Sequence, residues 1–187
     1  QVYCFNRQNS LVLTTSKDYG SYIQTVAWAP NANYLAVGGA SPTDNHELQI
    51  YYLNDNNYLE TVTHKMYGNV IEGIAWSPDG NYLVVGPIFS TRGEEIQIYY
   101  FDGSTLTFID GIDYGSYVYE VDWSPNGRYL AVGGGLPSDD KEIKIYPVSW
   151  IYSEIPVAGE TAADIEISDA LINASKNLTL ENITLHV

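Results

Sequence analysis

The residue types that most often carry catalysis or bind metals are few in this chain, and they are not spaced as ligands. Its three histidines, His46, His64 and His186, fall in different parts of the sequence without metal-ligand spacing. Cys4 is the only cysteine and has no histidine near it in sequence, so no disulfide can form within the chain. We expect exposed loop or strand histidines and a small buried thiol rather than a nucleophile.

Carboxylates offer two further candidate sites. Two equivalent loops contain oxygen-bearing side chains of the kind that Ca²⁺ binds, namely Asp44, Asn45, Glu47 and Ser138, Asp139, Asp140. They lack the fixed spacing of a calcium loop, and we interpret them as solvated turns.

A glycoside hydrolase or lactonase would need inward-facing carboxylates or metal ligands. Gln24, Glu72 and Tyr119 share one repeated position, but one glutamate does not make a two-carboxylate site. No phosphate-binding glycine loop, nucleophile elbow or zinc motif occurs. The sequence therefore predicts a protein that is not an enzyme, with no catalytic residue, no bound metal and no cofactor.

Charge and hydropathy restrict the partners. The net charge is −15, from 23 acidic and 8 basic residues, and the basic residues are scattered. No basic patch could neutralise a run of phosphates, so we expect no nucleic-acid binding. No apolar run approaches the roughly 20 residues that a membrane-spanning helix needs.

A repeat dominates the sequence. The segments VAWAPNANYLAVGG, IAWSPDGNYLVVGP and VDWSPNGRYLAVGG place Trp28, Trp76 and Trp123 at intervals of 48 and 47 residues. The segments ELQIYYL, EIQIYYF and EIKIYPV keep the same interval. Each repeat predicts a strand ending at the tryptophan, a turn with Pro and Asn, Asp or Gly, and second strands over 34–37, 82–85 and 129–132. A third strand alternates as a half-buried strand does, and a fourth lies near 58–63 and 106–109.

Four antiparallel strands in each 47–48 residues predict the blades of an all-β propeller. The phrases WSPDGNYLVVG and WSPNGRYLAVGG, followed by EIQIYYF and EIKIYPV, resemble the WD-repeat family over roughly residues 1–150, with TolB-like propellers as a neighbouring family. Two motifs depart from that family. Tyr-Tyr or Tyr-Pro replaces the Trp-Asp pair that closes its third strand, and Tyr-Gly replaces its Gly-His pair. The resemblance implies a propeller without the family's histidine-containing hydrogen-bond network.

The repeat also predicts the domain organisation. Residues 1–20 match the second half of a blade, residues 21–158 form three blades, and residues 159–187 form a β-rich tail. The tail either starts a parallel β-helix or pairs with the half blade. Its Asn-x-Ser/Thr triplets at Asn173, Asn177 and Asn182 are glycan acceptors in a secreted protein or chance matches. Rings typically need four to eight blades, so either further blades lie outside this sequence or copies of it assemble.

The most distinctive candidates for recognition are tyrosines in or beside the loops that join one blade to the next. These residues are Tyr19, Tyr22, Tyr67, Tyr114 and Tyr117. They either ring an exposed rim suited to a partner or pack between blades. The sequence predicts a non-catalytic protein-binding or scaffolding propeller. The alternative is a structural subunit of a cell-surface or extracellular assembly such as a filament or layer.

Overall fold

The computed structural model describes residues 1–7, 10–40, 45–88 and 93–148, and within them it contains thirteen β-strands and no helix. A two-stranded sheet, the half blade, contains β1 (Val2–Phe5) and β2 (Leu11–Thr15). Blade 1 contains β3 (Ile23–Trp28), β4 (Tyr34–Gly39), β5 (Leu48–Leu53) and β6 (Leu59–Lys65). Blade 2 contains β7 (Ile71–Trp76), β8 (Tyr82–Pro87), β9 (Ile96–Phe101) and β10 (Leu106–Ile112). Blade 3 contains β11 (Val118–Trp123), β12 (Tyr129–Gly134) and β13 (Ile143–Pro147).

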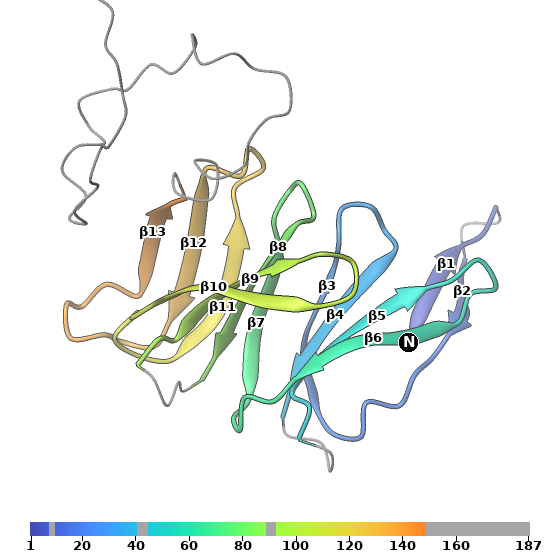
Figure 1. Cartoon of the computed structure of the whole chain (residues 1–187), viewed down its shortest axis with the longest axis horizontal. Helices are drawn as coiled ribbons and strands as arrows, with labels where there is room; N and C mark the ends of the chain where they lie inside the picture. Colours follow the sequence, from blue (N-terminus) through green and yellow to red (C-terminus); the bar gives the residue numbers. More distant parts are fainter. Residues whose placement is uncertain (8–9, 41–44, 89–92, 149–187) are drawn as a thin grey trace, which may run out of the picture. The chain divides into compact units, whose positions relative to one another are not determined.

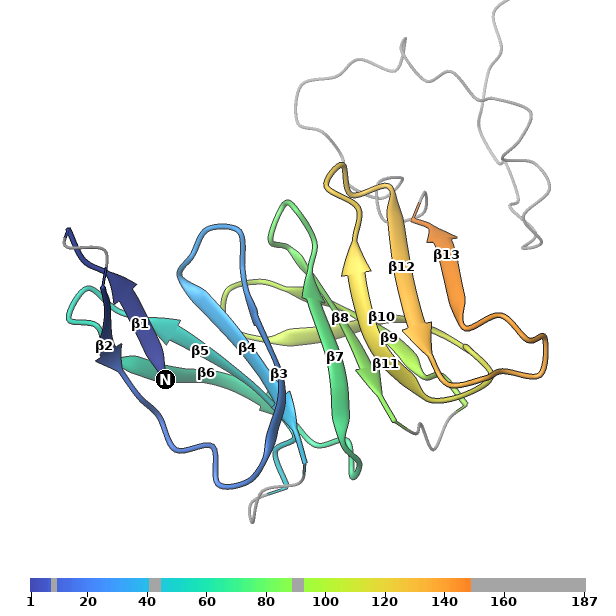
Figure 2. The same cartoon turned by 180° about the vertical axis from the view of Figure 1, so that it is seen from behind.

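Every ladder in these sheets is antiparallel and joins strands that follow one another in the sequence (Figures 1 and 2). The inner strands β3, β7 and β11 neighbour one another, with β7 in the middle. This arrangement confirms the prediction of all-β propeller blades. The predicted tail over 159–187 and the end of the third blade over 149–158 lie outside the described residues.

The turn between the first and second strands repeats its local geometry. The N–H of Asn33 donates to Asn31 Oδ1 at 3.0 Å, and Asn81 donates to Asp79 Oδ1 at 3.1 Å. The residue between them is left-handed in each case, with φ of 58° at Ala32 and 75° at Gly80. Alanine therefore stands in blade 1 where blade 2 has the glycine that this conformation favours.

The tryptophans at the ends of the first strands pack between blades. Trp76 and Trp123 are buried, and the indole N–H of Trp76 donates to the Ala27 carbonyl of blade 1 at 3.1 Å. Trp28 is 42% exposed.

The burial of the third strand of blade 1 shows that one prediction was wrong. The alternation of the third strands predicted one buried and one exposed face, yet Leu48, Gln49, Ile50 and Tyr51 of β5 are all buried. Leu48 and Ile50 join the core shared with blade 2, whereas Tyr51 joins the core shared with the half blade. Sheets cover both faces of β5, so its period of two separates two interfaces rather than core from solvent.

Candidate functional site

The loops that join successive sheets lie at one end of the blades. They connect β2 to β3, β6 to β7 and β10 to β11, and we call this the interblade-loop end. Because the strands are antiparallel, the loops between second and third strands lie at the same end, toward the bottom of Figure 1. All five tyrosines of the predicted rim belong to this end.

Two of these tyrosines are structural. Tyr19 is 6% exposed and its hydroxyl donates to the Glu47 carbonyl at 2.7 Å. Tyr114 is fully buried, and its hydroxyl makes the same bond to the Glu142 carbonyl at 2.7 Å. Burial raises the pKa of the Tyr114 hydroxyl, and the nearby Glu142 carboxylate adds to the effect. For Tyr19 and Tyr114 the packing alternative holds, and neither ring is open to a partner.

Tyr67 occupies the same loop position between blades 1 and 2. Its ring meets Tyr99 edge to face with centroids 6.4 Å apart. Burial raises the pKa of the Tyr67 hydroxyl well above its usual value, and Tyr99 adds to the rise. We interpret Tyr67 as a packing residue as well.

The other two tyrosines reach solvent. Tyr22 is 80% exposed and Tyr117 is 40% exposed. Their carbonyls accept bonds from the N–H groups of Ala40 and Gly135, at 2.9 and 2.8 Å, which tie each loop to the end of its second strand. The structure therefore holds Tyr22 and Tyr117 at fixed backbone positions, with Tyr22 largely and Tyr117 partly exposed to solvent.

A repeated β-bulge adds a third exposed tyrosine. In β3 the pairing passes from Ile23 directly to Thr25, and β7 and β11 show the same break in register. The residues skipped are Gln24, Glu72 and Tyr119. A bulge turns the extra side chain away from the regular pleat, and Tyr119 is 52% exposed. These three residues shared one position in the sequence repeat, but only the structure shows that the position is a bulge.

Two glutamates at equivalent positions each accept hydrogen bonds from the loop that leads to the next blade. Glu47 is fully buried, and its Oε2 accepts bonds from the N–H groups of Tyr67 at 2.8 Å and Gly68 at 3.3 Å. Glu95 repeats the contact one blade later, where Oε2 accepts from Tyr114 N–H at 3.1 Å. The prediction that Glu47 belongs to a solvated turn is therefore wrong, because its side chain is fully buried.

Lys144 pairs with neighbouring groups of blade 3 at this end. Lys144 Nζ lies 3.2 Å from Asp139 Oδ2, donates to the Tyr114 carbonyl at 2.9 Å, and sits 5.0 Å from the centre of the Tyr114 ring. Burial raises the pKa of Asp139, but the hydrogen bond and charge of Lys144 outweigh it and leave that pKa lowered. Asp139 thus faces a lysine. Across the described ranges, no three His, Cys, Asp or Glu side chains converge to hold a metal ion.

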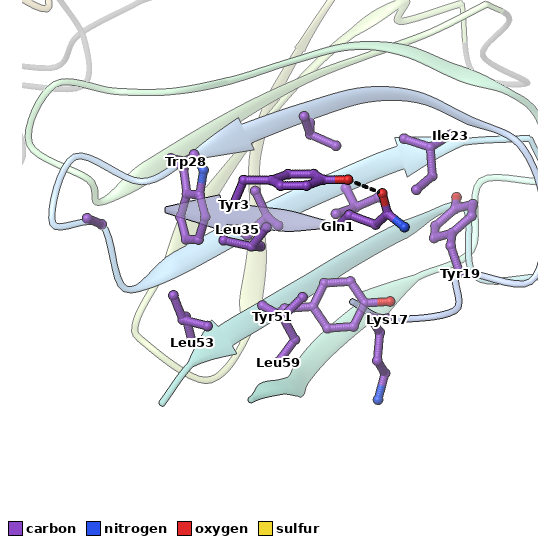
Figure 3. Close-up of a pocket in the computed structure, with 14 residues that line it drawn as sticks. Gln1, Tyr3, Lys17, Tyr19, Ile23, Trp28, Leu35, Tyr51, Leu53 and Leu59 are labelled. Atoms are coloured by element: carbon purple, nitrogen blue, oxygen red, sulfur yellow. Dashed lines mark hydrogen bonds between the residues drawn. The ribbon is translucent and has the colours of Figure 1, made fainter. Parts of the chain in front are cut away.

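The histidines make a contact that was not predicted, and the cysteine contradicts its prediction. The rings of His46 and His64 stack with centroids 3.5 Å apart, because the β5–β6 register sets His64 opposite Gln49. The spacing in sequence gave no sign of this contact, and His186 lies outside the described residues. Cys4 is exposed, which contradicts the predicted burial. Tyr3 beside it points into a groove, so the alternation of β1 turns Cys4 to the opposite face (Figure 3).

That groove lies between the half blade and blade 1 and has a volume of about 470 Å³ (Figure 3). Its walls are mainly apolar and include Ile23, Val26, Trp28 and Leu35. Two of its polar groups are already paired, since Tyr3 Oη donates to Gln1 Oε1 at 2.6 Å and Tyr19 Oη donates to the Glu47 carbonyl. The groove offers apolar contact rather than the convergent polar groups of a catalytic pocket.

Solved propellers resemble this fold. The chain matches the β-propeller domain of Cps50 (Swd1) from Myceliophteria thermophila with a TM-score of 0.56 at 16% identity, covering 76% of this chain and 45% of that one. A chain of the Mitotic Checkpoint Complex matches with a TM-score of 0.53 at 26% identity, over 67% of this chain and 37% of that one. A protein from Lactobacillus plantarum matches with a TM-score of 0.63 at 14% identity, over 80% and 45%. The chain thus spans less than half the length of each of these structures.

These matches identify the fold as a WD-repeat-like β-propeller. The structure contains no membrane-spanning helix in the ranges that it describes. The comparison with curated proteins finds no match. A family model covers residues 1–154, most of the chain, and its description is eukaryotic translation initiation factor eIF2A. The chain therefore belongs to the eukaryotic translation initiation factor eIF2A family.

Proposed function

We propose that this chain is a non-catalytic propeller segment that binds protein partners of translation initiation through its interblade-loop end. The WD-repeat-like fold supports a protein-interaction or scaffold role in general. The family's name supports translation initiation as the setting. Nothing in the described residues favours the alternative of a filament or layer.

The observation that carries the proposal is the exposed aromatic surface at this end. Tyr22, Tyr117 and Tyr119 are 80%, 40% and 52% exposed, although buried tyrosines hold the same loops in place. Large aromatic side chains on a rigid backbone lose little conformational entropy on binding and are enriched at protein interfaces. Glu72 and Glu120 lie on the neighbouring inner strands β7 and β11 and give this surface an acidic border.

The test compares the two ends of the blades. The wild-type chain, a Tyr22→Ala/Tyr119→Ala variant and a Tyr58→Ala control are each immobilised on beads. The beads are then incubated with a eukaryotic extract that is active in translation. Tyr58 is 66% exposed and lies in the turn between β5 and β6, at the opposite end. Quantitative mass spectrometry should find initiation proteins that the double variant loses at least tenfold and the control retains. Equal capture by the three proteins would contradict the proposal.

A further inference from the structure

The contact between His46 and His64 is a feature that the proposed function does not use. The two rings stack with centroids 3.5 Å apart and planes inclined by 26°. His46 lies in the loop before β5 and is partly exposed, and His64 lies in β6 and is exposed. Both residues belong to the interblade-loop end of blade 1, so an ion from solvent reaches the rings without any opening of the fold.

The backbone of the blade places these two positions face to face. The strand registers make Gly111 of blade 2 equivalent to His64, and Glu94 stands where blade 1 has His46. A Cβ added at Gly111 would lie 2.5 Å from Glu94 Cδ. The side chain two residues before the third strand therefore lies over the same point of the fourth strand in both blades. The sequence of blade 1 fills both of these facing positions with histidine.

The main chain holds both histidines, whereas their rings stay adjustable. The His46 carbonyl accepts the side-chain amide N–H of Gln49 at 3.3 Å, and His64 is paired within the β5–β6 ladder. The χ2 torsion of histidine has broad minima, so either ring turns about its Cβ–Cγ bond at little cost. Paired strands thus preorganise two nitrogen donors and leave them free to orient toward a ligand.

The ring spacing matches what one metal ion requires of two imidazoles. Zn–N bonds are about 2.0–2.1 Å long, so two nitrogens on a tetrahedral ion lie roughly 3.3 Å apart. Rings with centroids 3.5 Å apart reach this nitrogen separation when they tilt toward a shared ion. Imidazole suits Zn²⁺, Cu²⁺ and Ni²⁺, whereas Mg²⁺ and Ca²⁺ prefer oxygen ligands. The net charge of −15 also favours the approach of a cation over that of an anion.

We propose that His46 and His64 form a binding site for a divalent transition-metal ion of the zinc type. The two imidazoles provide two nitrogen ligands, and water completes the tetrahedral shell. Two protein ligands are fewer than the three that a catalytic zinc site normally has, so the ion binds reversibly. The bound ion joins the loop before β5 to β6, the outermost strand of blade 1, at the end where we propose that partners bind.

The test titrates Zn²⁺ into the full chain, without a histidine tag, at neutral pH. Isothermal titration calorimetry gives the affinity and stoichiometry, and ¹H NMR follows the Cε1–H signals of the histidine rings. We expect one bound ion per chain, with the signals of His46 and His64 shifting together and that of His186 unchanged. An equal concentration of Mg²⁺ should not displace Zn²⁺, because Mg²⁺ prefers oxygen ligands.

Single variants separate this site from other groups that bind zinc. His46→Gln and His64→Gln each remove one imidazole and keep a polar side chain. Loss of a group that only orients a metal ligand typically costs 10–100-fold in affinity, so loss of a ligand should weaken Zn²⁺ binding at least tenfold. His186→Gln and Cys4→Ser are the matched controls, because they remove the third histidine and the only thiol. Both controls should bind Zn²⁺ as the wild type does.

Three results would overturn the inference: no binding of Zn²⁺, unchanged affinity in either His46→Gln or His64→Gln, or an equal loss of affinity in a control. Urea midpoints of the metal-free variants check that each one is folded, and the wild-type ring signals decide the question if one is not. None of these measurements involves Tyr22 or Tyr119. The proposed function can therefore hold while the metal site fails, and the reverse.

Discussion

Replacing Glu47 by alanine removes the buried acceptor that ties blade 1 to the loop before blade 2. The carboxylate is fully buried and accepts two main-chain N–H bonds, from Tyr67 and Gly68. Without it, both donors remain near the interface with no side-chain acceptor. Glu95 and Glu142 hold the same position in the next two repeats. The three glutamates therefore form a series in which burial decreases from Glu47 to Glu95 to Glu142.

The magnitude follows from the three environments. A hydrogen bond to a charged group contributes roughly 1.5–3 kcal/mol, and burying a carboxylate without a cation offsets part of that. For Glu47→Ala we expect a loss of about 2–3 kcal/mol in the free energy of unfolding. Glu95 is partly exposed and accepts one N–H bond at 3.1 Å, so Glu95→Ala should cost about 1 kcal/mol. Glu142 is exposed, and Glu142→Ala should stay within the roughly 0.5 kcal/mol typical of surface substitutions.

The assay is urea unfolding followed by tryptophan fluorescence, with the slope checked for equality among the variants. Glu142→Ala keeps the main-chain carbonyl that accepts the Tyr114 hydroxyl, so it isolates the effect of the carboxylate. The reasoning is refuted if Glu142→Ala destabilises the chain as much as Glu47→Ala, or if Glu47→Ala leaves the midpoint unchanged.

Three further predictions concern turn strain, burial and close approach. Ala32→Gly should raise the free energy of unfolding by about 0.5–1 kcal/mol, because Ala32 has a φ of 58°; an unchanged urea midpoint would contradict this. Because the pKa of the Tyr67 hydroxyl is raised in the folded chain, this hydroxyl loses its proton in the unfolded chain at a lower pH, near 10.0, than in the folded chain. Stability should therefore fall above that pH, and less steeply in Tyr67→Phe when urea midpoints at pH 9 and 11 are compared. Gly38→Val should cost about 1–3 kcal/mol through overpacking against Ile71, whereas Gly133→Val, with no atom within 4 Å of its Cβ position, should lower the thermal midpoint far less.

The sequence alone was sufficient for the fold because its signals are local and repeated. The tryptophan, the Pro-Asn or Pro-Asp turn and the alternating third strand recur every 47–48 residues. Strand period and turn chemistry act over a few residues and need no knowledge of distant neighbours. They located the strands of blades 1 and 2 to within a few residues, and the family model over residues 1–154 agrees with a propeller.

Only the tertiary structure decided the environment of each side chain. Tyr19 and Tyr22 are three residues apart in one loop, yet one is buried and the other is 80% exposed. His46 and His64 meet through the register of two strands, and Glu47 finds its donors in the loop before the next blade. Each of these outcomes depends on a segment many residues away in the sequence, against which the chain packs. Repetition determined the strands, whereas packing between repeats determined which faces remain open for binding.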